Sequence, residues 1–101
     1  MINLDKVDIP SRIVEDLENV FRSFEEIEKV VLFGSRARKD NNESSDIDLA
    51  VYGISDNKWK FNDMMEDIST LYSFDIIFIS SDTSEKLLSQ IKKDGCVIYE
   101  R

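Results

Sequence analysis

Three short strand-like segments recur along this chain, and longer segments with helical spacing separate them. The strand-like segments span residues 29–33, 46–52 and 74–80, and a fourth, at residues 96–99, follows the last helical segment. Helices that alternate with strands are typical of a sheet that buries its apolar side chains against helices. The sequence therefore predicts an α/β (α+β) fold with a mixed β-sheet of about four strands packed against helices. A length of 101 residues indicates one domain, residues 1–101.

The helical segments are recognised by apolar residues at three- and four-residue spacing. The first follows Pro10, which suits the first turn of a helix, and its apolar positions are Ile13, Val14, Leu17, Val20, Phe21 and Phe24. The second has Ser55 or Asp56 as a candidate cap and an apolar face of Phe61, Met64, Met65, Ile68, Leu71 and Tyr72. The third begins at a sequence that resembles a capping box, Asp82-Thr83-Ser84-Glu85, and ends at Gly95. We expect Trp59 and Phe61 to lie in the core; a surface that binds a partner is the alternative.

Charge and composition exclude several classes of function. The formal net charge is −8, which argues against general nucleic-acid binding and suits a protein that concentrates divalent cations, although solubility alone would explain it equally well. The chain has no histidine and one cysteine, Cys96, so a disulfide framework, a structural zinc site and a histidine base are excluded. No segment has the pattern of a signal peptide or a membrane span. We therefore expect a cytoplasmic protein, without a membrane partner, whose chemistry depends on carboxylates.

Asp46 and Asp48 are the first candidates for that chemistry. The two-residue period of a strand places both carboxylates on one face, with Ile47, Leu49 and Val51 on the other. At about 4 Å and an effective dielectric constant of about 20, two such anions repel by roughly 4 kcal/mol. A hard, oxygen-binding cation such as Mg²⁺ would offset this repulsion. The alternative is that this face of the strand is simply solvated.

Two further features are informative only together with the aspartate pair. Asp75 interrupts an otherwise apolar segment, 74–79, and a buried carboxylate is costly unless it is paired with a charge or a metal; exposure at the start of the strand is the alternative. Gly34 and Ser35 end the first strand abruptly before a helical start. Free backbone N–H groups, a glycine and a hydroxyl can form a phosphate cradle, although a Gly-Ser turn alone is weak support for one.

The combined spacing is much more specific than its parts. Gly34-Ser35, ten further residues, Asp46-Ile47-Asp48, and then Asp75 at the opening of the next strand resemble the nucleotidyltransferase signature of the DNA polymerase β superfamily. The stretches 33–38, 46–51 and 74–99 are most similar to the minimal nucleotidyltransferases (MNT), the small prokaryotic branch. The resemblance extends from about residue 30 to residue 99 and implies the nucleotidyltransferase fold.

The resemblance also implies a role for each matched residue. Gly34 and Ser35 would bind the β- and γ-phosphates of a nucleoside triphosphate, and Arg38 would steady the phosphate loop or the triphosphate. Asp46, Asp48 and Asp75 would be the catalytic residues and the ligands of two Mg²⁺ ions, and Asp75 would also help to deprotonate the acceptor hydroxyl. Lys39 stands where many relatives have glycine. This departure leaves details of the loop open but not the metal site.

Three functions are consistent with the resemblance. In the first, the chain transfers a nucleoside monophosphate, AMP from ATP, to a hydroxyl of a partner protein. Small MNT proteins often act as antitoxins beside a helical HEPN-domain toxin, and a chain of this length leaves little surface for an acceptor pocket of its own. In the second, the chain is a non-catalytic antitoxin that neutralises a HEPN partner by binding. The third, a subunit resembling antibiotic-modifying enzymes, would require a helical acceptor region. The carboxylate set favours activity. The acceptor, the nucleotide preference and the oligomeric state remain open.

Overall fold

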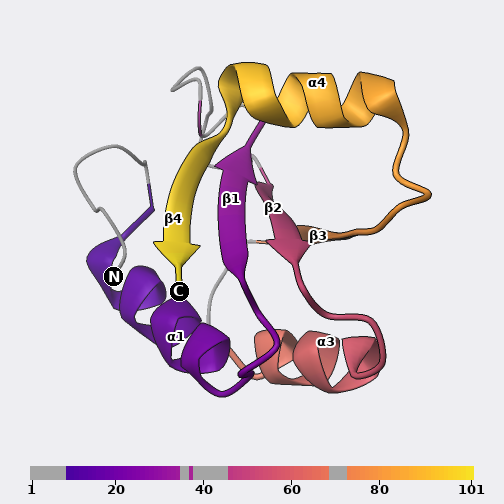
Figure 1. Cartoon of the computed structure of the whole chain (residues 1–101). Coiled ribbons are helices and arrows are strands. Elements are labelled where there is room, and N and C mark those ends of the chain that lie inside the picture. Colours follow the sequence, from indigo (N-terminus) through magenta and orange to yellow (C-terminus); the bar gives the residue numbers. More distant parts are fainter. Residues whose placement is uncertain (1–8, 35–36, 38–45, 69–72) are drawn as a thin grey trace.

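The structure, a computed structural model, describes residues 9–34, 37, 46–68 and 73–101. In chain order its elements are α1 (Ser11–Arg22), β1 (Lys29–Phe33), β2 (Ile47–Tyr52), α3 (Lys58–Glu66), β3 (Phe74–Ile79), α4 (Glu85–Asp94) and β4 (Cys96–Glu100) (Figure 1). The strands form one four-stranded sheet in the order β3-β2-β1-β4. Neighbouring strands are antiparallel except β2 and β3, which are parallel. The predicted mixed sheet packed against helices is therefore confirmed.

Helices cover both faces of the sheet. α1 and α3 lie together on one face, over the larger apolar core, which includes Leu32, Leu49 and Ile98 (Figure 1). α4 covers the other face through a smaller core of Val31, Ala50 and Ile91. The two central strands, β1 and β2, are thus buried on both sides. This burial explains why β1 is a continuous apolar run rather than an alternating one.

α1 follows the predicted apolar spacing closely. Five of its apolar residues are buried against the sheet: Ile13, Val14, Leu17, Val20 and Phe21. Pro10 is the N-cap residue rather than a residue of the first turn, so the helix begins at Ser11, one position later than predicted. Phe24 is also buried, but it lies beyond the end of the helix. Its ring packs 5.6 Å from that of Phe61, and these aromatic rings join α1 to α3.

α3 differs most from the prediction. It begins at Lys58 after Asn57, so the predicted cap at Ser55 or Asp56 is wrong, and it ends at Glu66, before Ile68. Leu71 and Tyr72 lie outside the described residues. Phe61 is fully buried as expected, but Trp59 is 70% exposed. Two residues of an α-helix span about 200°, so Trp59 and Phe61 point in nearly opposite directions and only one can face the core.

The C-terminal part corrects one local prediction and confirms another. The N-cap of α4 is Ser84, whose Oγ accepts a hydrogen bond from the backbone N–H of Leu87 at 3.2 Å, so the capping box that starts at Asp82 is wrong. Gly95 is the C-terminal cap of α4, as predicted, and its backbone is extended. In β4 a register shift opposite Val30 and Val31 lets both Ile98 and Tyr99 enter the larger core.

In the described part of the chain, no helix is both long and apolar enough to cross a membrane.

Candidate active site

The sheet brings two of the predicted site residues, Asp48 and Asp75, to one place. Asp48 of β2 lies opposite Phe33, the last residue of β1, on one side and opposite Asp75 of β3 on the other. Residues paired across neighbouring strands project from the same face of a sheet. Leu49 and Ile76, the next residues along, face the larger core. The two carboxylates are therefore neighbours on the opposite face, the one that α4 covers further along.

Gly34 fits closely against Asp48. Its backbone has a φ of +78°, a conformation that residues with a side chain rarely adopt. A Cβ atom added to Gly34 would overlap with Asp48 Oδ2 and stand 3.1 Å from Asp48 Cγ. Glycine is therefore required here for two reasons, the left-handed backbone and the space that the Asp48 carboxylate occupies. The predictions from sequence included neither this contact nor its consequence, that the turn after β1 positions a carboxylate.

Asp46 and Asp75 are both exposed. Asp46 lies immediately before β2, next to residues outside the described ranges. Of the two interpretations of Asp75, exposure near the start of the strand is right and burial is wrong, because β3 is the edge strand of the sheet and only β2 flanks it. Within residues 9–34, 37, 46–68 and 73–101, no three acidic or cysteine side chains gather closely enough to hold a metal ion. The structure thus places Asp48 beside Asp75, whereas Asp46 lies just before the first residue of β2.

The face that carries Asp48 is not solvated along its length. Ala50, two residues further along β2, is fully buried beneath α4. Asp48 itself is half-buried, at the point where this cover ends. Ser35 and Arg38, the other predicted phosphate contacts, lie outside the described residues, as does Lys39. Ala37 is described and packs against the larger core just beyond Gly34.

The donor set suits a hard divalent cation. Like charges directly opposite each other on neighbouring strands destabilise a sheet, and Asp48 and Asp75 are such a pair. Carboxylate oxygens are the protein ligands that Mg²⁺ takes, usually one or two of them together with substrate phosphates. The Asp48 carboxylate itself fills the place that a side chain on Gly34 would take, so the turn after β1 holds this ligand in position. The residues present therefore fit a magnesium ion that shares its coordination with a phosphorylated substrate.

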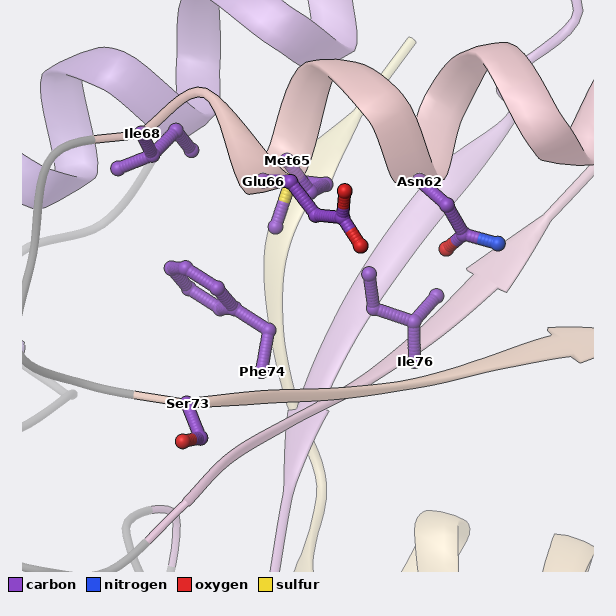
Figure 2. Close-up of a pocket in the computed structure, with 7 residues that line it drawn as sticks. All are labelled: Asn62, Met65, Glu66, Ile68, Ser73, Phe74 and Ile76. Carbon is purple, nitrogen blue, oxygen red and sulfur yellow. The ribbon is translucent and has the colours of Figure 1, made fainter.

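A separate cavity of about 470 Å³ lies between α3 and β3 (Figure 2). Its lining includes Met65, Glu66 and Ile68 on the helix side and Phe74 and Ile76 on the strand. Phe74 and Ile76 alternate with Asp75 along β3, so the cavity opens on the face opposite the carboxylates. It is therefore not part of the carboxylate site. Sequence patterns did not predict it, because a gap between a helix and a strand depends on three-dimensional packing.

The family of the chain follows from its sequence. Residues 15–101 match the family described as polymerase beta, nucleotidyltransferase. This match includes most of the chain, so the protein belongs to the polymerase β-like nucleotidyltransferase family. No curated protein matches the sequence significantly.

Solved structures, among them toxin–antitoxin complexes, have folds similar to that of this chain. A chain of a toxin–antitoxin crystallised with AMP-PNP superimposes with a TM-score of 0.68 at 18% identity, over 87% of this chain and 73% of that one. A chain from the complex of tri-AMPylated Shewanella oneidensis HEPN toxin with MNT antitoxin gives 0.65 at 16% identity, over 92% and 74%. A Sulfolobus solfataricus protein classed as a nucleotidyltransferase gives 0.58 at 26% identity, over 90% and 79%. The expected resemblance to chains of HEPN/MNT complexes is thereby confirmed at the level of the fold.

Proposed function

We propose that this protein is a magnesium-dependent nucleotidyltransferase that transfers AMP from ATP to a hydroxyl group of a HEPN-domain partner protein, as the antitoxin of a HEPN/MNT pair. The observation that carries the proposal is the register that sets Asp48 beside Asp75, with Gly34 leaving room for the Asp48 carboxylate. Family membership supports the reaction class. The AMPylated toxin in the Shewanella complex supports the choice of nucleotide and acceptor.

In this proposal Asp48 and Asp75 hold the metal ions together, and Asp46, immediately before β2, adds a third carboxylate when substrate is bound. Two bound Mg²⁺ ions would stabilise the negative charge that develops on the attacking and leaving oxygens. Gly34 lets the triphosphate approach the backbone, and Ser35 and Arg38 contact its phosphates. The protein thus contributes mainly positioning and neutralisation, as in other phosphoryl-group transfers.

The transfer step exchanges one bond to phosphorus for another. The acceptor hydroxyl oxygen attacks the α-phosphorus, and the bond from that phosphorus to the oxygen bridging to the β-phosphate breaks. Pyrophosphate leaves with that oxygen, and the hydroxyl proton passes to Asp75. The side chain of Asp75 is exposed on the face of the sheet, so a residue of a second protein has access to it. A bulky anion added near the active site of the partner would then disturb its function through charge and bulk.

The test is the intact mass of a HEPN partner after incubation with this protein, ATP and Mg²⁺. We expect the partner to gain one or more AMP units with the parent protein and none with the Asp46→Ala/Asp48→Ala double variant. Asp56→Ala removes an exposed carboxylate beyond the opposite end of β2 and serves as the matched control, which should modify the partner as the parent does. A partner whose mass never changes, with folded parent protein and ATP present, would refute the transfer.

A second function, neutralisation by binding alone, has support from the crystallisation of relatives as toxin–antitoxin complexes. In that case the antitoxin would cover the partner, and the carboxylates would be dispensable. The same Asp46→Ala/Asp48→Ala variant distinguishes the two functions. Full neutralisation of the partner by this variant, without any modification, would favour the binding antitoxin.

A further inference from the structure

The two edges of the described sheet differ in how they are protected. β4, at one edge, carries a register shift, ends at Glu100 and is followed by Arg101, features that discourage pairing with another strand. β3, at the other edge, pairs with β2 without a register shift and contains one charged residue, Asp75. Its remaining residues are apolar and only half-buried. An unprotected apolar edge of this kind is a template for a further strand.

The backbone of β3 has hydrogen-bonding groups that point outward. The carbonyl of Ser73 accepts a bond from the N–H of Ile47 in β2, and alternate residues of a strand direct their backbone groups to the same side. Asp75, Ile77 and Ile79 therefore bond to β2. Phe74, Ile76 and Phe78 direct their N–H and C=O groups away from the sheet described here.

Trp59 extends this edge into a wider surface. It is the most exposed large apolar side chain of the described residues. On α3 it lies one turn before Asn62 and about two turns before Glu66, so the three share one stripe of the helix. Asn62 and Glu66 line the cavity above β3 (Figure 2). The stripe and the outer edge of β3 are therefore continuous, and Trp59 is the kind of residue that dominates binding at interfaces.

We infer that this surface, the outer edge of β3 together with Trp59, Asn62 and Glu66 of α3, binds a second copy of this chain. Antiparallel pairing of β3 with itself about a twofold axis at Ile76 matches the outward-facing groups of the two strands. Phe74 then faces Phe78 of the second copy, and Asp75 faces Ile77. No two like charges are opposed across the strands, which favours self-pairing.

The same twofold axis places the exposed Trp59 of each copy next to the cavity of the other copy. Figure 2 places Asn62 over Ile76 and Ile68 over Phe74, so α3 runs opposite to β3. The ammonium group of Lys58, beside Trp59, lies 5.7 Å from the ring of Phe78, consistent with that direction. Trp59 therefore lies toward the Phe78 end of its own strand. The twofold axis places the Phe78 end of each β3 strand beside the Phe74 end of the other copy. Since the cavity lies at the Phe74 end, each Trp59 would enter the cavity of the other copy.

Sedimentation of the full chain over a range of concentrations tests this inference. The buffer should hold about 0.15 M salt, because the charge of −8 on each copy opposes association at low ionic strength. We expect a monomer–dimer equilibrium, and we expect Trp59→Ala to raise the dissociation constant about tenfold or more while its circular dichroism matches the parent. Val97→Ala is the matched control: among the described residues Val97 is the other exposed large apolar side chain, 43% exposed, on the opposite edge strand, and its loss should leave the equilibrium unchanged.

Hydrogen exchange identifies the surface that is covered. The amide of Ile76 should become protected as the concentration of the parent rises, and that protection should be lost in Trp59→Ala. The amide of Ile77, which bonds to β2, should be protected in both. A parent that remains monomeric would overturn the inference, as would a dimer that survives Trp59→Ala with the Ile76 amide unprotected. Protection of Ile76 that is independent of concentration would also overturn it.

Discussion

Replacement of Gly34 by alanine tests how the site is built, because two separate costs can be estimated from the structure. The φ of +78° costs a residue with a side chain about 1–2 kcal/mol of folding free energy. This corresponds to a fall in Tm of about 4–8 °C for each kcal/mol in a domain of this size. The added Cβ would also overlap with Asp48 Oδ2, so the carboxylate must move by about 1 Å to restore ordinary contact. A displacement of that size in a catalytic group can lower the rate about 100-fold.

Gly53→Ala is the matched control, because we expect it to lower stability more than Gly34→Ala does while activity is retained. Gly53 has a φ of +110°, and a Cβ there would overlap with the backbone carbonyl oxygen of Glu26 and stand 3.0 Å from the backbone nitrogen of Glu28. Backbone atoms cannot rotate aside, so this variant should lose more stability than Gly34→Ala. Gly53 lies at the far end of β2 from Asp48, so the folded fraction should retain its activity.

The assay combines thermal unfolding with the rate of AMP transfer per folded molecule. We expect Gly34→Ala to lose about two orders of magnitude in rate with a modest fall in Tm, and Gly53→Ala to show the opposite pattern. If Gly34→Ala transferred AMP at the parent rate, the contact with Asp48 would be irrelevant to catalysis. The same result would remove the main structural support for a site at this position.

Three further predictions concern the ligands and the helix cap. Mg²⁺ together with ATP should raise the Tm by mass action, whereas Asp48→Asn should abolish that rise while the protein stays folded; a rise of parent size in the variant would place the metal elsewhere. Ser35→Ala should weaken ATP binding, measured by calorimetry, by roughly 1–2 kcal/mol, because one hydroxyl donor is lost while the backbone donors remain; unchanged affinity would remove Ser35 from the phosphate site. Ser84→Ala should cost about 1 kcal/mol of stability in urea unfolding and Asp82→Ala close to none, and the reverse order would restore Asp82 as the cap.

Local patterns were sufficient to place the strands. The apolar run of β1 is bounded by a charged residue and Gly34, and the alternation in β2 ends at Gly53, so both strands were predicted within one residue of their observed limits. The faces of β2 were also predicted, because the two-residue period is a property of the backbone itself. Caps were less predictable: Asp82, Thr83 and Ser84 stand in a row, and each of these residue types can cap a helix.

Sequence patterns could not predict the features that depend on the order of the strands in the sheet. The apolar neighbours of Asp75 left burial and exposure both open, and only the position of β3 at the edge of the sheet explains why the side chain is exposed. The pairing of Asp48 with Asp75 joins residues 27 positions apart, which local spacing cannot specify. The fit of Gly34 against Asp48 likewise requires the antiparallel register of β1 and β2. The resemblance to a known family named these residues, but only the sheet shows how they meet.

The position of the metal is the most direct test of the proposed active site. The protein should be crystallised with Mn²⁺, which replaces Mg²⁺ and scatters anomalously, and with an ATP analogue that cannot be cleaved at the α-phosphate. We predict an anomalous peak about 2.1 Å from carboxylate oxygens of both Asp48 and Asp75, with Asp46 and phosphate oxygens of the analogue completing the coordination. An analogue bound without metal at these two residues, or with its metal held by other side chains, would contradict the account.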